Sequence, residues 1–428
     1  MLSRARILLP VEYRDGMRDS RARSGSFDIA IVQREQLMVI TGWDYGSASN
    51  GFIHRAGCSP MHDDHFAGCA NDASGFWYRV DPQLHAEWLY AAPRAGCLPL
   101  ARLRELVEGW YQPGGPGMIT PIVTIATDEQ NGLLSTYAWT VRGEQLIPAS
   151  FDIVDAGADR LAPLHGYWPL QDLERTKILV IGAGSIGSVA CEALASYGAR
   201  SQTIIDPDHL SPHNFARHTA RRSDVGRLKV NAVARELKDH DDRVDAVSIA
   251  GDVIDDADIV CGELADTAAV LVCVDGVEPR RVANHLAVRA CIPVVFACVL
   301  DDGRVGEVLR VMPRRHECLS CNRERLAMQG ALALEASLDR GYGYGTRERP
   351  MTAVGGDLAL VGQLAAKAVI ATILERAGHH DQRLAGEHAT IGLRPSADLP
   401  APFDVALGEV RWQEGHPPRA GCVTCKWD

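Results

Sequence analysis

The chain has 428 residues, well above the roughly 100–200 residues of a typical domain, so we expect two or three domains. Apolar residues make up 46% and charged residues 23%, which predicts globular domains with packed cores and excludes a low-complexity chain. With 44 Lys and Arg against 55 Asp and Glu, the net charge is −11. Such a surface repels a phosphate backbone, which argues against nucleic acid as the main partner.

The apolar runs predict neither a secretion signal nor a membrane partner. The first 15 residues hold an apolar run of about five residues, which is too short for the core of a signal peptide. The stretch 358–374 is interrupted by Gly362, Gln363 and Lys367, and a membrane span needs roughly 18 apolar residues. We therefore expect a cytoplasmic protein whose 12 Cys stay reduced, so that paired Cys spacings indicate metal binding rather than disulfides.

Residues 1–155 have the mixed patterns of an α+β accessory domain. Runs of apolar residues alternate with polar ones, which is typical of strands, and one stretch has helical periodicity before a Gly- and Pro-rich segment. The expected elements are strands at 27–32, 36–40, 119–126 and 133–141, with a helix at 98–111.

From about residue 160 to the end, strands alternate with helices of ten or more residues. The first strand, 177–181, is an uninterrupted apolar run, as expected for a central strand covered by helices on both faces. This pattern predicts an α/β fold with a doubly wound, Rossmann-like, mostly parallel sheet. The expected elements are strands at 177–181, 203–205, 244–250, 270–274 and 294–299, and helices at 188–197, 229–237, 279–291 and 357–376.

A glycine pattern follows the first strand of this half and precedes a helix. Gly182 permits a tight turn, Gly184 lets the backbone approach an anionic phosphate, and Gly187 allows close packing of the helix on the strand. The amino terminus of the helix adds positive potential. The competing interpretation is a tight turn that binds nothing.

The residues after the second strand distinguish a triphosphate site from a dinucleotide site. Asp206 lies 19 residues after Gly187, where a carboxylate accepts hydrogen bonds from ribose hydroxyls, and a dehydrogenase would show the same two features. The segment continues through Asp208 and Asn214 to Arg217. Arg217 is suited to γ-phosphate oxygens, and Lys229 to charge that develops in nucleotidyl transfer. Each cation taken alone is equally consistent with a solvated surface charge.

Asp275 follows the strand at 270–274, where the carboxyl ends of parallel strands meet at a ligand crevice. A carboxylate there suits Mg²⁺, which takes few protein ligands and bridges phosphate oxygens. The alternative is an Asp placed before a helix because the helix dipole favours negative charge there.

Two Cys-x-x-Cys pairs, about 100 residues apart, have the spacing of a closed tetrahedral zinc site. Such a site is structural and would attach the carboxyl-terminal tail to the sheet. A redox pair or four unrelated buried thiols are the alternatives, and we expect neither pair to open a helix in a thioredoxin-like unit. The four residues are Cys318, Cys321, Cys422 and Cys425.

Taken together, residues from about 165 to 428 resemble the ubiquitin-activating superfamily, that is, the ThiF-, MoeB- and HesA-type adenylyltransferases. The resemblance rests on the glycine loop, the Asp206-x-Asp208 to Asn214-x-x-Arg217 block, Lys229, Asp275 and the split Cys pairs, in the family's order. It implies a ThiF-like adenylation domain over 160–428. By position it implies ATP at the glycine loop with Asp206 on ribose, Asn214, Arg217 and Lys229 on phosphates, Asp275 on Mg²⁺, and the four Cys on Zn²⁺.

The reaction that this resemblance implies is attack of a carrier protein's terminal carboxylate on the α-phosphate of ATP, which yields an acyl-adenylate and pyrophosphate. It implies a ubiquitin-like or sulfur-carrier protein as partner, a homodimer, and a conjugating enzyme in a bacterial conjugation or defence pathway. The alternatives are an NAD-dependent oxidoreductase and a non-catalytic scaffold that binds a nucleotide or a carrier.

The chain departs from the family in two places. Many members carry a reactive Cys between the first Cys pair and the last helix, but 322–356 contains none, and we expect Cys291 and Cys298 to be buried in a strand region. The family also places an Arg-rich helix before the glycine loop, where this chain has only Arg160 and Arg175. Residues 341–347 have the composition of a crossover loop, or equally of a plain surface loop.

The amino-terminal region weakly resembles a JAB/MPN-type core that has lost its metal site. His54, His62, His65 and the acidic pair 63–64 do not have the spacing of that zinc site, and we expect solvated loop residues. Cys97 is a faint match to the cysteine of a conjugating enzyme. We expect this domain to dock partners or to support dimerisation.

Overall fold

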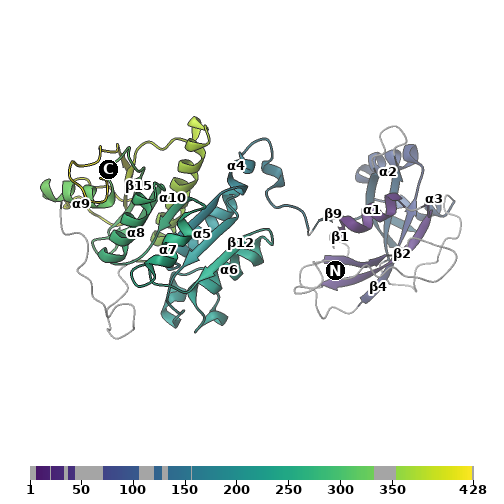
Figure 1. Ribbon diagram of the computed structural model, residues 1–428. Coiled ribbons are helices and arrows are strands. Elements are labelled where there is room, and N and C mark those ends of the chain that lie inside the picture. The colour runs from purple at the N-terminus through teal and green to yellow at the C-terminus, as the bar shows by residue number, and fades with distance from the viewer. Residues whose placement is uncertain are drawn as a thin grey trace. The chain divides into compact units, whose positions relative to one another are not determined.

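The computed structural model describes residues 6–19, 21–32, 37–43, 71–105, 120–127, 134–155, 157–331 and 353–426 (Figure 1). The chain divides into two compact units, Met1–Asp159 and Arg160–Asp428. Each unit has its own sheet and its own buried clusters, and each is described by itself.

The first unit is built on a nine-stranded mixed sheet with the strand order β5-β8-β7-β6-β4-β2-β3-β1-β9. Its described elements are β1 (Arg6–Pro10), α1 (Val11–Asp19), β2 (Ser24–Val32), β3 (Leu37–Trp43), β4 (Asn71–Arg79), α2 (Pro82–Ala95), β5 (Leu98–Pro99), α3 (Leu100–Arg104), β6 (Thr120–Thr127), β7 (Leu134–Arg142), β8 (Gln145–Pro148) and β9 (Phe151–Val154).

Both faces of this sheet carry a core, because successive strand residues point to opposite faces. On β4, Trp77 joins the cluster that holds Tyr13 and Met17 of α1. The next residue, Tyr78, joins the cluster that holds Trp88 of α2. The sheet therefore has helices on two sides.

The strands that the sequence predicts here are present within a few residues. The helix expected at 98–111 begins at Leu100, after the short strand β5, and residues 106–119 lie outside the described residues. The helix α2 was not predicted. His54, His62, His65 and the acidic pair 63–64 also lie outside the described residues.

The second unit is built on an eight-stranded sheet with the order β12-β11-β10-β13-β14-β15-β16-β17. Neighbouring strands are parallel from β12 to β14 and antiparallel from β14 to β17. Its strands are β10 (Lys177–Ile181), β11 (Ser201–Ile205), β12 (Asp245–Ile249), β13 (Thr267–Val272), β14 (Val294–Leu300), β15 (Val305–Val311), β16 (His388–Gly392) and β17 (Val410–Gln413). Its helices are α4 (Leu170–Glu174), α5 (Ser185–Tyr197), α6 (Lys229–His240), α7 (Ala257–Leu264), α8 (Val277–Arg289), α9 (Leu319–Met328) and α10 (Gly355–Arg376), with short 3₁₀ helices η3 (Ala162–Leu164), η4 (Pro212–Ala216), η5 (Arg222–Asp224) and η6 (His380–Gln382).

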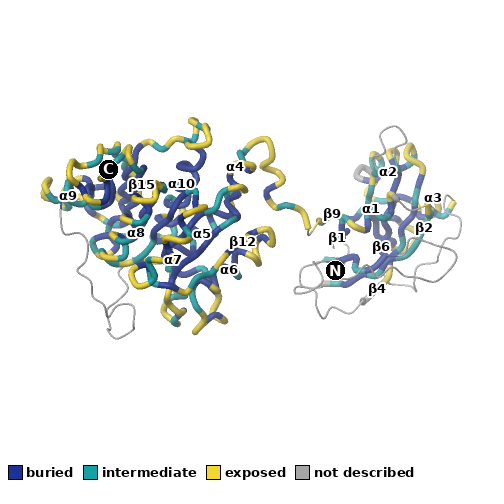
Figure 2. Tube along the Cα trace, in the orientation of Figure 1, coloured by how far each residue is buried: buried dark blue, intermediate teal, exposed yellow. Residues whose placement is uncertain are grey.

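Helices cover both faces of this sheet. Ile178 and Val180 of β10 pack in the cluster formed with α5, α6 and α10, whereas Leu179 and Ile181 pack in the cluster formed with α7, α8 and α9. Figure 2 shows that the interior of this unit is buried and that its exposed residues lie at the outside. The predicted α/β class is therefore confirmed, and the run 177–181 is a strand with the predicted bounds.

The helix α10 is long and apolar. By length and composition alone it could cross a membrane, but 67% of its most apolar window is buried inside the protein, as in the core helix of a soluble protein. It packs closely on α5, since a Cβ atom at Gly362 would lie 2.7 Å from the carbonyl oxygen of Ile186. The helix predicted at 357–376 is thus confirmed, beginning two residues earlier.

His85 of α2 makes the stability of the first unit depend on pH. Its side chain is 1% exposed and its Nε2 lies 3.1 Å from Thr124 Oγ1. Burial lowers the pKa of His85 to about 4. Because the unfolded chain binds this proton near pH 6.5, the stability that the neutral ring contributes is complete above pH 6.5 and is lost as the pH falls through 4.

We expect the loss to approach about 3 kcal/mol and to disappear in His85→Gln, which has no titrating group there. Hydrogen exchange of peptides from β6 and β7 between pH 7.5 and 4 measures it. An equal acid sensitivity in both proteins would contradict this assignment.

Candidate nucleotide site and cysteine cluster

The glycine loop joins the end of β10 to α5, which begins at Ser185, three residues before the predicted start. Gly182 has a φ of +99°, and a Cβ atom there would lie 2.7 Å from the carbonyl oxygen of Cys273. A Cβ atom at Gly187 would lie 1.9 Å from the carbonyl oxygen of Gly182. Neither position therefore has room for a side chain.

Gly184 is different, because a Cβ atom there would meet nothing within 4 Å. It is the N-cap of the 13-residue helix α5 and makes no side-chain cap hydrogen bond. Open space beside a helix amino terminus is the arrangement that accommodates a phosphate. The loop therefore combines two tightly packed glycines with one that faces free volume.

Asp206 follows β11 and ties that strand to the loop. Its carboxylate accepts a hydrogen bond from Ala183 N–H at 2.8 Å and another from Asp208 N–H at 2.9 Å. The residue is 7% exposed, and burial raises the pKa of its carboxyl although Lys229 opposes that shift. Each carboxylate oxygen has two lone pairs, so both can still accept a bond from a ligand hydroxyl.

Lys229, the first residue of α6, is paired with Asp208. Its Nζ lies 2.6 Å from Asp208 Oδ2, and its backbone N–H donates to Asp208 O at 2.9 Å. The Lys229 side chain is 13% exposed. The structure thus brings together the second Asp of the predicted block and the predicted phosphate cation, 21 residues apart.

Asn214 lies in the middle of η4, and Arg217 follows the end of that 3₁₀ helix. Asn214 Oδ1 accepts a hydrogen bond from Ser211 N–H at 2.8 Å, which closes a capping box, and Asn214 O accepts one from Arg217 N–H at 2.9 Å. A Cβ atom at Gly355 would lie 3.2 Å from Arg217 Cα. The first turn of α10 therefore packs against the segment that carries Arg217.

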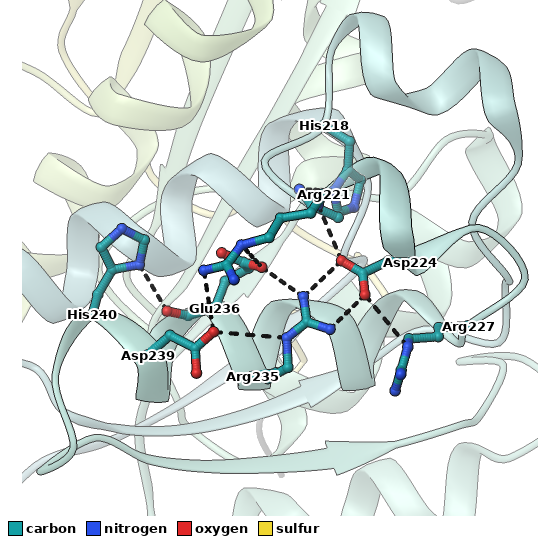
Figure 3. A network of polar contacts seen from close by, with 9 residues as sticks. His218, Arg221, Asp224, Arg227, Arg235, Glu236, Asp239 and His240 are labelled. Atoms are coloured by element: carbon teal, nitrogen blue, oxygen red, sulfur yellow. Dashed lines mark hydrogen bonds and ion pairs between the residues drawn. The ribbon is translucent and has the colours of Figure 1, made fainter. Parts of the chain in front are cut away.

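A network of charged residues holds the chain segment 218–228, which joins Arg217 to Lys229 (Figure 3). Asp224 is fully buried and accepts hydrogen bonds from Arg221 N–H at 3.0 Å and from Arg235 Nη2 at 2.7 Å. The Arg235 hydrogen bonds hold the pKa of Asp224 below its ordinary value. Arg221 also pairs with Glu236 of α6 at 3.0 Å, so the connection is attached to the helix that Lys229 begins.

Asp275 lies in the turn between β13 and α8 and is exposed. The N-cap of α8 is Gly276, which has no side-chain cap bond, so Asp275 does not cap this helix. Arg280 Nε donates to Val274 O at 3.1 Å, and Cys273 N–H donates to Ile181 O at 2.8 Å. These bonds place the Asp275 turn beside the end of β10, where the glycine loop begins.

The four Cys of the two predicted pairs form one cluster. Sγ–Sγ distances are 3.8 Å for Cys318–Cys321, Cys318–Cys422 and Cys321–Cys425, and all four sulfurs lie within 4.8 Å of one another. Zinc–sulfur bonds of about 2.3 Å would give a tetrahedral edge of about 3.8 Å. The cluster therefore fits a zinc ion.

The first Cys pair lies at the start of a helix. Cys318 is the N-cap of α9, and Cys321 lies in its first turn. Leu319 N–H donates to Asn284 Oδ1 of α8 at 3.0 Å, and His285 Nδ1 of the same helix lies 3.3 Å from Thr424 Oγ1. Both halves of the cluster are thus held by α8.

The structure also bears on the expectations for the other cysteines, for Arg160 and for the crossover loop. Cys298 is buried on β14, as predicted, whereas the prediction for Cys291 is wrong because it follows α8 and is exposed. Arg160 contacts Asp241 and His240 O within its own unit. Residues 332–352, which include the expected crossover loop at 341–347, lie outside the described residues.

The structure also brings His218 to the glycine loop, which the sequence analysis missed. Its Nε2 lies 2.8 Å from the carbonyl oxygen of Ala183. The two residues are 35 positions apart, and no local pattern signals their contact. Arg280 and Asn284 were missed for the same reason.

The glycines of the loop offer a matched pair of tests. We expect Gly187→Ala to lower the free energy of unfolding by more than about 2 kcal/mol, because its Cβ would overlap backbone atoms. Gly184→Ala has free space and an allowed backbone conformation, so its stability should stay within about 0.5 kcal/mol of wild type. Urea unfolding measures both, and similar losses would show that the loop is not packed as described.

Comparison with known proteins relates this arrangement to enzymes of known name. The Bacillus subtilis sulfur carrier protein ThiS adenylyltransferase is 29% identical over 165 residues, which are 38% of this chain and 48% of the relative. The Escherichia coli molybdopterin-synthase adenylyltransferase is 30% identical over 137 residues, which are 32% of this chain and 54% of the relative. The ATP-dependent ubiquitin transferase-like protein Cap2 of Enterobacter hormaechei is 40% identical over 67 residues, or 16% of this chain and 11% of the relative. The chain spans about half the length of these curated relatives, or less.

Among solved structures, E. coli MccB with AMPCPP and MccA aligns at a TM-score of 0.46 and 20% identity, covering 60% of this chain and 68% of that one. The ThiF family model matches residues 158–393, which is more than half of the chain. The chain therefore belongs to the ThiF family.

Proposed function

We propose that the protein is an ATP- and Mg²⁺-dependent adenylyltransferase that activates the terminal carboxylate of a ubiquitin-like or sulfur-carrier protein. The observation that carries the proposal is the open Gly184 at the start of α5, on a loop tied to the segment between Asp206 and Lys229. Family membership and relatives named as adenylyltransferases support it.

In the proposed reaction a carboxylate oxygen of the carrier attacks the α-phosphorus of ATP. A new P–O bond forms, the bond between the α-phosphorus and the bridging oxygen breaks, and pyrophosphate leaves with the bond electrons. The backbone at Gly184 and the amino terminus of α5 receive phosphate oxygens, and Asp206 accepts ribose hydroxyls. Arg217, Asn214 and Lys229 stabilise the charge that builds up on the leaving phosphates.

Lys229 would exchange partners during this reaction. Its ammonium group is paired with Asp208 at 2.6 Å. A triphosphate offers several acceptor oxygens to the same ammonium, so binding competes with the Asp208 pair. Asp208 thereby keeps the cation in place before ATP arrives.

Asp275 would hold Mg²⁺. Its carboxylate is exposed, in the turn beside the end of β10 where the glycine loop begins. Mg²⁺ is satisfied by one or two carboxylates together with phosphate oxygens and waters. The ion would neutralise charge on the leaving pyrophosphate.

We further propose that the unit is a Rossmann-like adenylation domain over 160–428 that acts as a homodimer in the cytoplasm, with a structural zinc ion on its four Cys. Residues 1–155 would form an accessory domain, a JAB/MPN-like core without its metal, that docks partners. A bacterial ubiquitin-like conjugation or defence pathway with a conjugating enzyme is the setting. The similarity of a short segment to Cap2 supports this setting.

Two other functions make different predictions. An NAD-dependent oxidoreductase would bind NAD with an affinity that Arg217→Ala leaves unchanged. A scaffold without chemistry would bind ATP or a carrier without forming an adenylate.

Pyrophosphate exchange tests the proposal. With a small Gly-ending protein encoded beside this one, or with ThiS as carrier, we expect wild type to exchange labelled pyrophosphate into ATP. Asp275→Ala and Arg217→Ala should each reduce exchange at least 100-fold, because charge on the transferred phosphates is no longer compensated.

The matched controls are Asp255→Ala, an exposed carboxylate in another turn, and Arg376→Ala, at the opposite end of α10 from Gly355. Both should keep wild-type exchange. Binding of ATP without exchange by any candidate carrier would instead favour the scaffold.

Metal analysis tests the zinc site. We expect one zinc per chain in wild type, and loss of that zinc with a lower melting temperature in Cys425→Ser, because a structural zinc contributes folding energy. Cys261→Ser, which replaces an exposed cysteine of α7 outside the cluster, should keep its zinc. Wild type that binds no zinc would rule out this assignment.

A further inference from the structure

His218 has a hydrogen-bond environment that defines its tautomer. Ala183 O can only accept, so Nε2 at 2.8 Å must carry a proton and donate it. Ala220 N–H can only donate, so Nδ1 at 3.0 Å must be unprotonated and accept. The ring is 9% exposed and is therefore held as a neutral imidazole with its proton on Nε2.

This ring acts on one peptide of the glycine loop. The Ala183–Gly184 peptide is trans and planar, so its C=O and N–H point in opposite directions. Since the C=O points at His218, the Gly184 N–H is directed away from His218. The N–H of Ala183, one peptide earlier, is held by Asp206 at 2.8 Å.

Gly184 is also the position where a Cβ would meet nothing within 4 Å. The hydrogen bond from His218 to the Ala183 carbonyl therefore orients the N–H of Gly184, the residue that borders free volume. A peptide free to rotate would present its carbonyl oxygen to an anion for part of the time, which repels it.

We propose that His218 is a positioning residue for nucleotide binding, which holds the Ala183–Gly184 peptide with the Gly184 N–H available to a phosphate of ATP. The proposal rests on the proposed function of this loop as the phosphate site. His218 does not touch the nucleotide and acts through the peptide that it binds.

The charges around His218 agree with a neutral ring. Burial lowers the pKa of His218, and Lys229 and Arg217 act in the same direction. The Ala183 carbonyl and Asp224 act in the opposite direction, and Asp224 is itself paired with Arg235. Protonation of Nδ1 would set an N–H against Ala220 N–H, so the arrangement is lost only as the pH falls well below 6.5.

Titration with a fluorescent ATP analogue and Mg²⁺ on the full chain tests the proposal. His218→Phe fills the space without a donor, and we expect its dissociation constant to rise about tenfold or more at pH 7.5. His218→Gln places an amide N–H near the position of Nε2 and should recover most of that affinity. At pH values well below 6.5 the affinity of wild type should fall more steeply than that of His218→Gln, since the amide does not titrate.

Two measurements separate this role from a merely structural one. A structural role would lower the melting temperature and the number of binding sites, whereas a positioning role raises the dissociation constant at full stoichiometry. The control is His240→Gln, at an exposed histidine that ends α6, and it should bind as wild type does. The ¹⁵N spectrum of the imidazoles, assigned by the signal absent from His218→Gln, should show an Nε2-protonated neutral ring at pH 7.5.

The proposal is overturned if His218→Phe binds the analogue as tightly as wild type, or if the ring carries its proton on Nδ1 at pH 7.5. If wild type binds the analogue but does not exchange pyrophosphate, only the proposed adenylation is contradicted, and the role of His218 in binding stands. Wild type that fails to bind it would overturn both.

Discussion

The glycine loop of the second unit depends on the close approach of Gly187 to the carbonyl of Gly182, where a Cβ atom would lie 1.9 Å from the oxygen. No side chain fits, so the first turn of α5 lies directly against the end of β10. The same loop touches β13, because Gly182 has no room beside the carbonyl of Cys273. This packing brings the amino terminus of a buried helix to the place where two neighbouring parallel strands end, which is where α/β proteins bind ligands.

The buried carboxylates of this unit differ in how their charge is compensated. This difference distinguishes Asp206, at the glycine loop, from Glu307 and Asp224. Burial alone would raise the pKa of Glu307, but its pairing with Arg323 and its hydrogen bond to His388 hold that pKa well below the ordinary value. Asp224 is held low by Arg235. Asp206 accepts hydrogen bonds from the backbone amides of Ala183 and Asp208, and burial raises its pKa. Two backbone donors do not exhaust the four lone pairs of this carboxylate, so its oxygens can still accept bonds from the ribose hydroxyls that we propose for it.

Local signals predicted the centre of the fold but not its periphery. The strand β10 and the helix α10 were predicted because continuous apolar burial leaves a strong pattern. The helix α2 was missed although Asp81 caps its start, Pro82 occupies its first turn and Gly96 ends it. These start and stop signals are present in the sequence, so this helix was predictable from it. The contact of His218 with Ala183 spans 35 residues, so only the folded chain reveals it.

The helix α8 contacts both the Asp275 turn and the cysteine cluster. Its first turn carries Arg280, which bonds the carbonyl of Val274 just before the Asp275 turn. Asn284 and His285, about one turn further along, contact Leu319 and Thr424, which lie within the two Cys pairs. Holding the cysteines together thus also holds the helix from which the Asp275 turn extends. A cluster that closes segments 104 residues apart thereby restrains the exposed carboxylate to which we assign Mg²⁺.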